Sequence, residues 1–215
     1  MKKLGLKTTV AAGGGKKIVE MAAKKISEGS VIAYPTESSY ALGADATNAR
    51  AVKKIFAFKG REKSRPLPII VADLKMSKKY LVLDVGAEKL CKQFMPGPLT
   101  LVVEKRKIPE GVVKELSQSG VAFRIPGNKI AREICEKSGR PITSTSANDS
   151  GKPPVFSSKQ LEKKYSKKIG LIADAGELPK KPPSTIVDLR GATPVLLREG
   201  PVPFHKVLRA LKKTS

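Results

Sequence analysis

The sequence has few of the side chains on which many enzymes rely for catalysis. Among 215 residues there are two cysteines, one histidine and no tryptophan, and aromatic residues make up 5% of the chain. A histidine-dependent catalytic triad or a histidine-based metal site is not expected, because His205 stands alone. Cys91 and Cys135 lie in apolar patterns outside any CxxC pair, so we expect two buried free thiols.

Acidic residues and long apolar runs are also scarce. The 42 Lys and Arg residues outnumber the 19 Asp and Glu residues, which gives a formal net charge of +23. Such a charge attracts polyanions such as nucleotides and RNA, although scattered lysine pairs are equally typical of a solvated surface. No apolar run is long enough to cross a membrane, and no apolar signal core follows the N-terminus. We therefore predict a cytoplasmic protein without a membrane partner.

Length and composition favour one folded domain. Apolar residues make up 40% of the chain, which is typical of a globular protein. We expect residues 1–215 to form a single domain, with residues 1–15 as a flexible N-terminal segment. The AAGGGKK stretch in this segment lacks the spacing of a phosphate-binding loop, and no GxGxxG motif supports a dinucleotide site.

Apolar periodicity predicts helices that alternate with strands. Asn48 and Gly60 have the residue types that begin and end a helix. The order of the elements predicts an α/β fold, a twisted mixed sheet covered by helices, with sites in loops at strand ends. Helices are expected over residues 16–29, 48–60, 86–94, 129–137, 157–165 and 204–212, and strands over 31–34, 67–72, 100–104, 121–125 and 142–144 and near Leu171, Ile186 and Val195.

Two short segments have the residue types of a site for a phosphorylated anion. Lys59, Arg61 and Arg65 offer charge-assisted hydrogen bonds to phosphate or carboxylate oxygens, and the later run TSTSAN at 143–148 offers neutral donors. By itself, each segment is as well explained by a solvated face or a polar turn. Arg124 is predicted at a strand end, a position that suits a cleft, and Arg198 is a further cation.

Seven segments, in this order, closely resemble the YrdC-like family of threonylcarbamoyl-AMP synthases. The family's K-x-R and distant S-x-N motifs occur as Lys59-Gly60-Arg61 and Ser146-Ala147-Asn148. The resemblance implies the YrdC-like fold in its single-domain form, with a concave basic cleft. It extends from about Val31 to Pro201 and comprises YPTESSYALG, KGREKSRPLPIIV, MPGPLTLVV, VAFRIP, TSTSANDSGKPP, STIVDL and LLREGP.

The resemblance also implies an activity and its site. The enzyme would be a nucleotidyltransferase that joins L-threonine, bicarbonate and ATP into threonylcarbamoyl-AMP and releases pyrophosphate. Mg²⁺ would accompany ATP, without a metal site of the protein's own. The product would pass to a transferase that forms N6-threonylcarbamoyladenosine in tRNA. The implied catalytic residues are Lys59 and Arg61; the implied ATP-binding residues are Lys59, Arg61, Arg65, Ser146, Asn148 and Arg198; the implied threonine-binding residues are Ser38, Arg124, Ser144 and Ser184.

Three positions depart from the usual family pattern. Ala41 stands where a glycine is common, Glu62 where a proline is usual, and Ile70 where many members have a polar residue or histidine. We expect these departures to affect substrate selectivity. Two other functions stay open: a non-catalytic RNA- or tRNA-binding paralogue in ribosome or RNA maturation, and carbamoyl-adenylate chemistry with a donor other than threonine.

Overall fold

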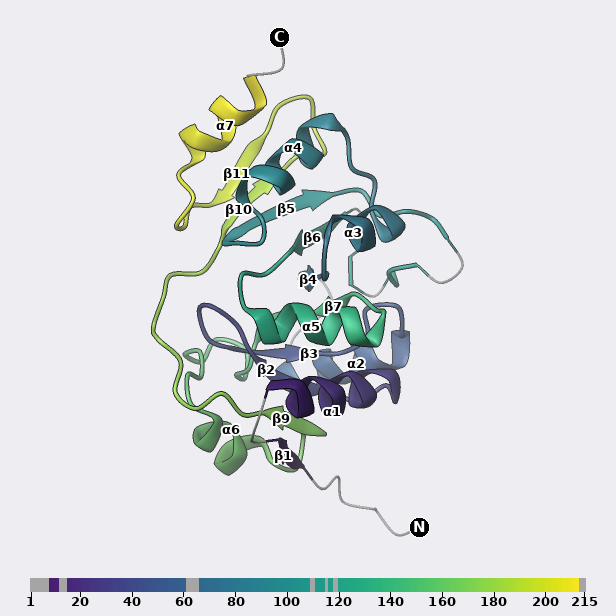
Figure 1. The fold of residues 1–215 in the computed structure, drawn as a ribbon, viewed down its shortest axis with the longest axis vertical. Coiled ribbons are helices and arrows are strands. Elements are labelled where there is room, and N and C mark those ends of the chain that lie inside the picture. Colours follow the sequence, from purple (N-terminus) through teal and green to yellow (C-terminus); the bar gives the residue numbers. More distant parts are fainter. Residues whose placement is uncertain are drawn as a thin grey trace.

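The computed structural model describes residues 8–11, 15–60, 66–108, 111–114, 116–117 and 120–212. Helices are interspersed with single strands and with runs of two or three strands along this part of the chain (Figure 1). The helices are α1 (Gly15–Ser27), α2 (Ala49–Lys59), α3 (Leu74–Tyr80), α4 (Val85–Phe94), α5 (Lys129–Ser138), α6 (Ser158–Tyr165) and α7 (Phe204–Lys212). The strands are β1 (Thr9–Ala11), β2 (Ile32–Pro35), β3 (Tyr40–Gly43), β4 (Ile69–Ile70), β5 (Leu99–Val103), β6 (Val121–Arg124), β7 (Ile142–Thr143), β8 (Thr145–Ser146), β9 (Leu171–Ala173), β10 (Thr185–Asp188) and β11 (Val195–Arg198).

The strands form two mixed sheets rather than the one that we expected. A five-stranded sheet has the order β1-β9-β2-β3-β8, and a six-stranded sheet has the order β11-β10-β5-β6-β4-β7. In Figure 1 the five-stranded sheet occupies the lower half and the six-stranded sheet the upper half. Both sheets combine parallel and antiparallel pairs, so the predicted mixed α/β class is confirmed.

The TSTSAN run passes from one sheet into the other. Thr143 lies in β7 of the six-stranded sheet, whereas Thr145 and Ser146 form β8 of the five-stranded sheet. Ser144 is the residue between them, and its N–H donates to the Pro68 carbonyl at 2.8 Å. This short segment therefore joins the two sheets, and its polar side chains lie at the seam between them.

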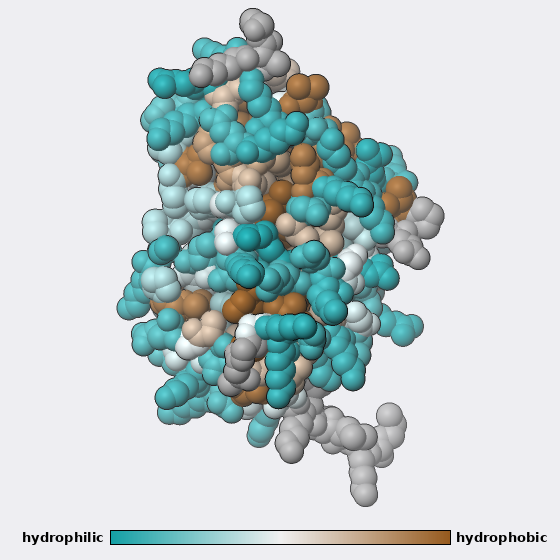
Figure 2. All heavy atoms as spheres, viewed as in Figure 1, coloured by the Kyte–Doolittle hydropathy of each residue, from teal (hydrophilic) through white to brown (hydrophobic). Residues whose placement is uncertain are grey.

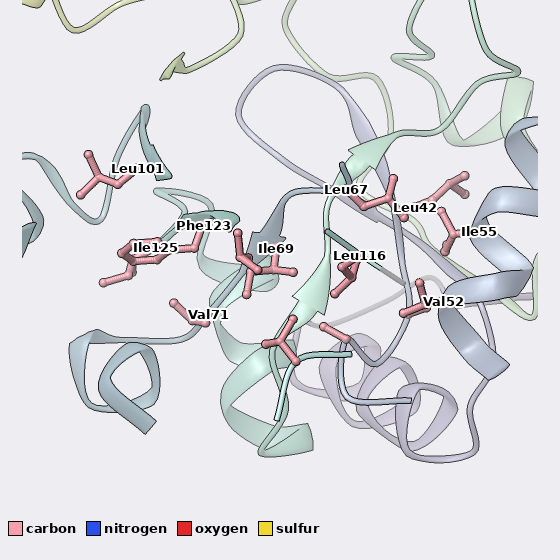
Figure 3. Close-up of a cluster of buried hydrophobic side chains, with 14 of the residues drawn as sticks. Leu42, Val52, Ile55, Leu67, Ile69, Val71, Leu101, Leu116, Phe123 and Ile125 are labelled. Carbon is pink, nitrogen blue, oxygen red and sulfur yellow. The ribbon is translucent and has the colours of Figure 1, made fainter. Parts of the chain in front are cut away.

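Apolar side chains from both sheets form the core. Figure 3 shows part of this core, with Ile69 near its centre. Leu42 of β3 and Val52 and Ile55 of α2 lie to one side of Ile69, and Phe123 lies to the other side. All five side chains are buried. Burial of such side chains is the main favourable term in folding, so this shared core is what holds the two sheets beside each other.

Helix ends follow the local rules of the sequence. The Asn48 side chain accepts hydrogen bonds from Arg50 N and Ala51 N at 3.0 and 3.1 Å, so it caps α2 as predicted. Gly60 ends the same helix in the left-handed conformation, with φ of 56°. Lys59, the last residue of α2, is thereby placed at a fixed point beside the seam.

Several elements differ from the prediction. Tyr40–Gly43 form β3 inside a segment for which we predicted no helix or strand. All four residues are buried, so the strand lacks the alternating pattern by which a half-exposed strand is recognised. Helix α3 was not predicted; Asp73 caps it by accepting from Met76 N at 2.7 Å. Residues 9–11, inside the segment expected to be flexible, form β1 and pair with β9.

Polar side chains cover most of the face that Figure 2 shows. Smaller apolar patches lie between them. Among the described residues, no helix is long and apolar enough to cross a membrane. Cys91 and Cys135 are both buried and unpaired, as predicted.

Candidate active site

A cavity of about 390 Å³ lies at the seam between the two sheets. The turn between β2 and β3, the TSTSAN run and the ends of β6 and β11 all reach it. Six of the predicted site residues line it, although they come from five separate parts of the chain: Ser38, Arg124, Ser144, Ser146, Ser184 and Arg198.

Lys59 and Asn148 lie behind this lining and hold it in place. Lys59 is 5% exposed, and its Nζ donates to the Ser146 carbonyl at 2.8 Å and to Asn148 Oδ1 at 2.7 Å. Ser146 Oγ donates to the same Oδ1 at 2.6 Å, and Asn148 Nδ2 donates to the Lys152 carbonyl. The K-x-R lysine and the S-x-N segment therefore form one hydrogen-bonded unit, although they are far apart in the sequence.

Arg124 ends β6, as the sequence predicts, and its side chain is 10% exposed. Its Nη2 lies 3.2 Å from Glu37 Oε2 in an ion pair. Glu37 belongs to the turn between β2 and β3, so this contact crosses from one sheet to the other. A guanidinium at this place suits a carboxylate or phosphate ligand, because it presents several N–H donors in a fixed fork.

Arg198 closes another side of the cavity. Its Nε and Nη2 donate to the Ser184 carbonyl at 2.9 and 2.8 Å, and Ser184 Oγ lies 2.8 Å from Thr100 Oγ1. Burial lowers the pKa of Arg198 from its ordinary value, and the positive charge of Arg124 lowers it further. Two guanidinium groups thus feel each other's charge in one cavity, an arrangement that an anionic ligand would relieve.

The turn before β3 is ordered by its own hydroxyl groups. Thr36 Oγ1 donates to the Ser39 carbonyl at 2.6 Å, and Ser38 N and Ser39 N both approach the same Oγ1 at 3.3 Å. This pattern is a hydroxyl-closed turn, as the Ser- and Thr-rich sequence suggests. Ser38 lines the cavity together with Thr36 and Ser39.

Sequence reasoning missed three polar residues of the site. Lys181 and Thr100 line the cavity, and Glu37 is the ion-pair partner of Arg124. The only signals were the Lys180-Lys181 pair, which resembles the other scattered pairs, and a single acid within the hydroxyl-rich turn. Two of the departures from the family pattern, Ala41 and Ile70, line the cavity as well.

Some predictions fall outside the described residues. Arg61, Arg65 and Glu62 lie in the segment 61–65. The roles implied for these residues therefore stay predictions, as do the individual roles of the residues in the cavity.

The family model Sua5/YciO/YrdC, whose description is "Telomere recombination", matches residues 24–200 of this chain. The chain belongs to the Sua5/YciO/YrdC family. The segments that carried the resemblance in the sequence are therefore family segments, and they are also the ones that meet at the seam between the sheets.

This chain is similar to curated members of the Sua5/YciO/YrdC family and to solved structures from it. It is 40% identical to the threonylcarbamoyl-AMP synthase of Pyrococcus abyssi over 90% of its own length, but spans 57% of that protein. It is 35% identical to a putative threonylcarbamoyl-AMP synthase of Methanocaldococcus jannaschii, covering 90% of this chain and 91% of that protein. The structure of P. abyssi Sua5 with L-threonine matches with a TM-score of 0.83 and 38% identity, covering 95% of this chain and 60% of that one.

Proposed function

We propose that this member of the family is a threonylcarbamoyl-AMP synthase. The single observation that supports the proposal most is the cavity, where Arg124, Arg198 and five serine residues meet. Two guanidinium groups and several hydroxyls suit a ligand pair with a carboxylate, a hydroxyl and phosphates, as threonine and ATP together provide. The relatives named as synthases support the same activity.

The proposed roles divide the cavity between the two substrates. The carboxylate of L-threonine would pair with Arg124, and the serine hydroxyls would bind its polar groups: Ser38, Ser144 and Ser184. ATP would lie against the Lys59 and TSTSAN unit and Arg198, with Arg61 and Arg65 contributing cations. Lys59 is hydrogen-bonded to Ser146 and Asn148. We therefore propose that Lys59 chiefly holds the hydrogen-bond donors of this unit in place for ATP.

The chemistry needs no protein nucleophile. The threonine amine attacks the carbon of CO₂ formed from bicarbonate, loses a proton and becomes a carbamate. A carbamate oxygen then attacks the α-phosphorus of ATP in line, and pyrophosphate leaves. Positioning and neutralisation of the phosphate charge are the main requirements of such a transfer, and fixed Arg and Lys donors supply both. The protein would thus be a nucleotidyltransferase.

Mg²⁺ is proposed to enter with ATP. The residues that line the cavity are hydroxyl, cationic and apolar, and Asp and Glu are not among them. Within the described ranges, no three His, Cys, Asp or Glu side chains gather at one point. These donors do not fit a protein site for Mg²⁺, which prefers carboxylate and phosphate oxygens. The triphosphate oxygens would therefore carry the ion.

The product would be handed to a transferase that modifies tRNA, in the cytoplasm where ATP and tRNA are found. The net charge of +23 favours a direct contact with the tRNA as part of this transfer. A fall in tRNA affinity with rising salt would support such a contact, since released counterions drive it.

The proposal is tested by incubating the protein with ATP, Mg²⁺, bicarbonate and L-threonine. We expect pyrophosphate and threonylcarbamoyl-AMP to form only when all four are present. Release of pyrophosphate without threonine dependence, or no adenylate product, would refute the proposal. Carbamoyl phosphate in place of threonine and bicarbonate tests the other donor, and binding of tRNA without turnover would indicate the non-catalytic function.

A further inference from the structure

Glu37 is an acidic residue at the edge of a site whose polar lining consists of cations and hydroxyls. Its side chain is 23% exposed, and its Oε2 faces Arg124 Nη2 at 3.2 Å. The Oε2 atom itself is buried and, within the described part of the chain, has no hydrogen-bond partner. The Oε2 atom is therefore turned toward Arg124 and away from solvent.

The other oxygen of Glu37 is held by the backbone. Gly127 N donates to Oε1, and a Cβ atom added at position 127 would lie 2.9 Å from this oxygen. That distance is shorter than van der Waals contact, so a side chain at position 127 would push the Glu37 carboxyl group out of its present place. Glu37 is thus fixed on one side by the loop that follows β6 and reaches Arg124 with its other oxygen.

The ion pair with Glu37 is placed to restrain the direction of the Arg124 side chain. A guanidinium has five N–H donors in one plane, so a contact at Nη2 determines where the other donors point. Arg124 lines the cavity, whereas Glu37 does not. Glu37 therefore contacts the Arg124 guanidinium from outside the cavity lining. The negative charge of Glu37 also lies beside Arg124, the guanidinium whose positive charge helps to lower the pKa of Arg198.

We propose that Glu37 is a positioning residue that aims Arg124 at the carboxylate of the amino-acid substrate. This inference rests on the proposed function, because it takes L-threonine as the ligand of Arg124. The inference predicts in which direction the affinity for L-threonine changes when Glu37 is replaced. Removal of a negative charge would by itself strengthen the binding of a carboxylate, whereas loss of positioning weakens it.

The test uses Glu37→Gln, which keeps the size of the side chain and removes its charge. We expect the Kd for L-threonine, measured by calorimetry, and the KM for L-threonine to rise about tenfold, the loss expected for one misaligned charged contact. The KM for ATP should stay near the wild-type value. Glu37→Asp keeps the charge but has a shorter side chain, so its KM for L-threonine should lie between those of the wild type and of Glu37→Gln.

A second variant and a control separate this effect from a general loss of structure. Gly127→Ala presses on Oε1 without altering either charge and should raise the threonine KM selectively as well. Glu162→Gln changes an exposed acid on α6 and should alter neither KM.

Each outcome decides the question. Unchanged or tighter threonine binding in Glu37→Gln would overturn the inference, and so would an equal rise of both KM values. Wild-type protein that binds threonine without turnover would refute the proposed function, yet the Kd values would still test Glu37. If the wild-type protein neither binds nor uses threonine, both proposals fail.

Discussion

Lys59 offers the sharpest test of how the candidate site is built. Its ammonium group is buried and donates to the Ser146 carbonyl and to Asn148 Oδ1. Lys59→Met keeps most of the apolar stem but removes both hydrogen bonds. The Ser146 carbonyl then loses this donor, while Asn148 Oδ1 still accepts from Ser146 Oγ at 2.6 Å.

The magnitude follows from these contacts. A buried acceptor that loses its donor costs about 1–3 kcal/mol, and the weakened Asn148 contact adds to this. Relief from burying the ammonium charge offsets part of the sum. We expect Lys59→Met to lower the free energy of unfolding by about 2–3 kcal/mol, which for a chain of this size corresponds to a fall in Tm of about 4–12 °C.

Thermal unfolding followed by circular dichroism measures the fall in Tm, and the pyrophosphate assay measures activity. The matched control is Lys159→Met, at an exposed position on α6, which should change Tm by only about 1–2 °C. Loss of activity in Lys59→Met with an unchanged Tm would refute the structural reasoning, because it would show that Lys59 acts on ATP without supporting the TSTSAN run.

Two other predictions follow from the structure. Gly200→Ala should lower the free energy of unfolding by about 1–3 kcal/mol in a denaturant titration, since the new Cβ would lie 2.3 Å from the Pro183 carbonyl oxygen; Gly191→Ala, whose Cβ would have 3.7 Å of clearance, is the control, and an equal effect of both would contradict the prediction. Burial raises the pKa of Cys91 to about 12 and that of Cys135 in the same direction, so iodoacetamide at neutral pH should label neither thiol until the protein is unfolded. Rapid labelling of the native protein, detected by mass spectrometry, would show that the thiols are accessible.

Local patterns were sufficient for the helices other than α3. The apolar face of α1, the Asn48 cap and the Gly60 end of α2 follow from neighbouring residues, because a helix closes its hydrogen bonds within its own segment. Strands were less predictable. β3 has four buried residues and therefore no alternation, and the short β8 depends on a partner that is distant in the sequence.

Six of the residues that line the cavity were also available from the sequence, as candidates, through the order of the seven family segments. Their arrangement was not. Lys59 could not be recognised as a buried residue, and Glu37 could not be recognised as the partner of Arg124, since both properties arise from contacts across the seam.

The sequence by itself thus determined the α/β class, the family and the candidate residues, because these depend on local periodicity and motif order. Only the tertiary structure decided that the strands divide into two sheets, that the TSTSAN run joins them, and which cations line the cavity. The physical reason is that ion pairs, burial and cavities depend on distances between segments, and the packing of the shared core fixes those distances.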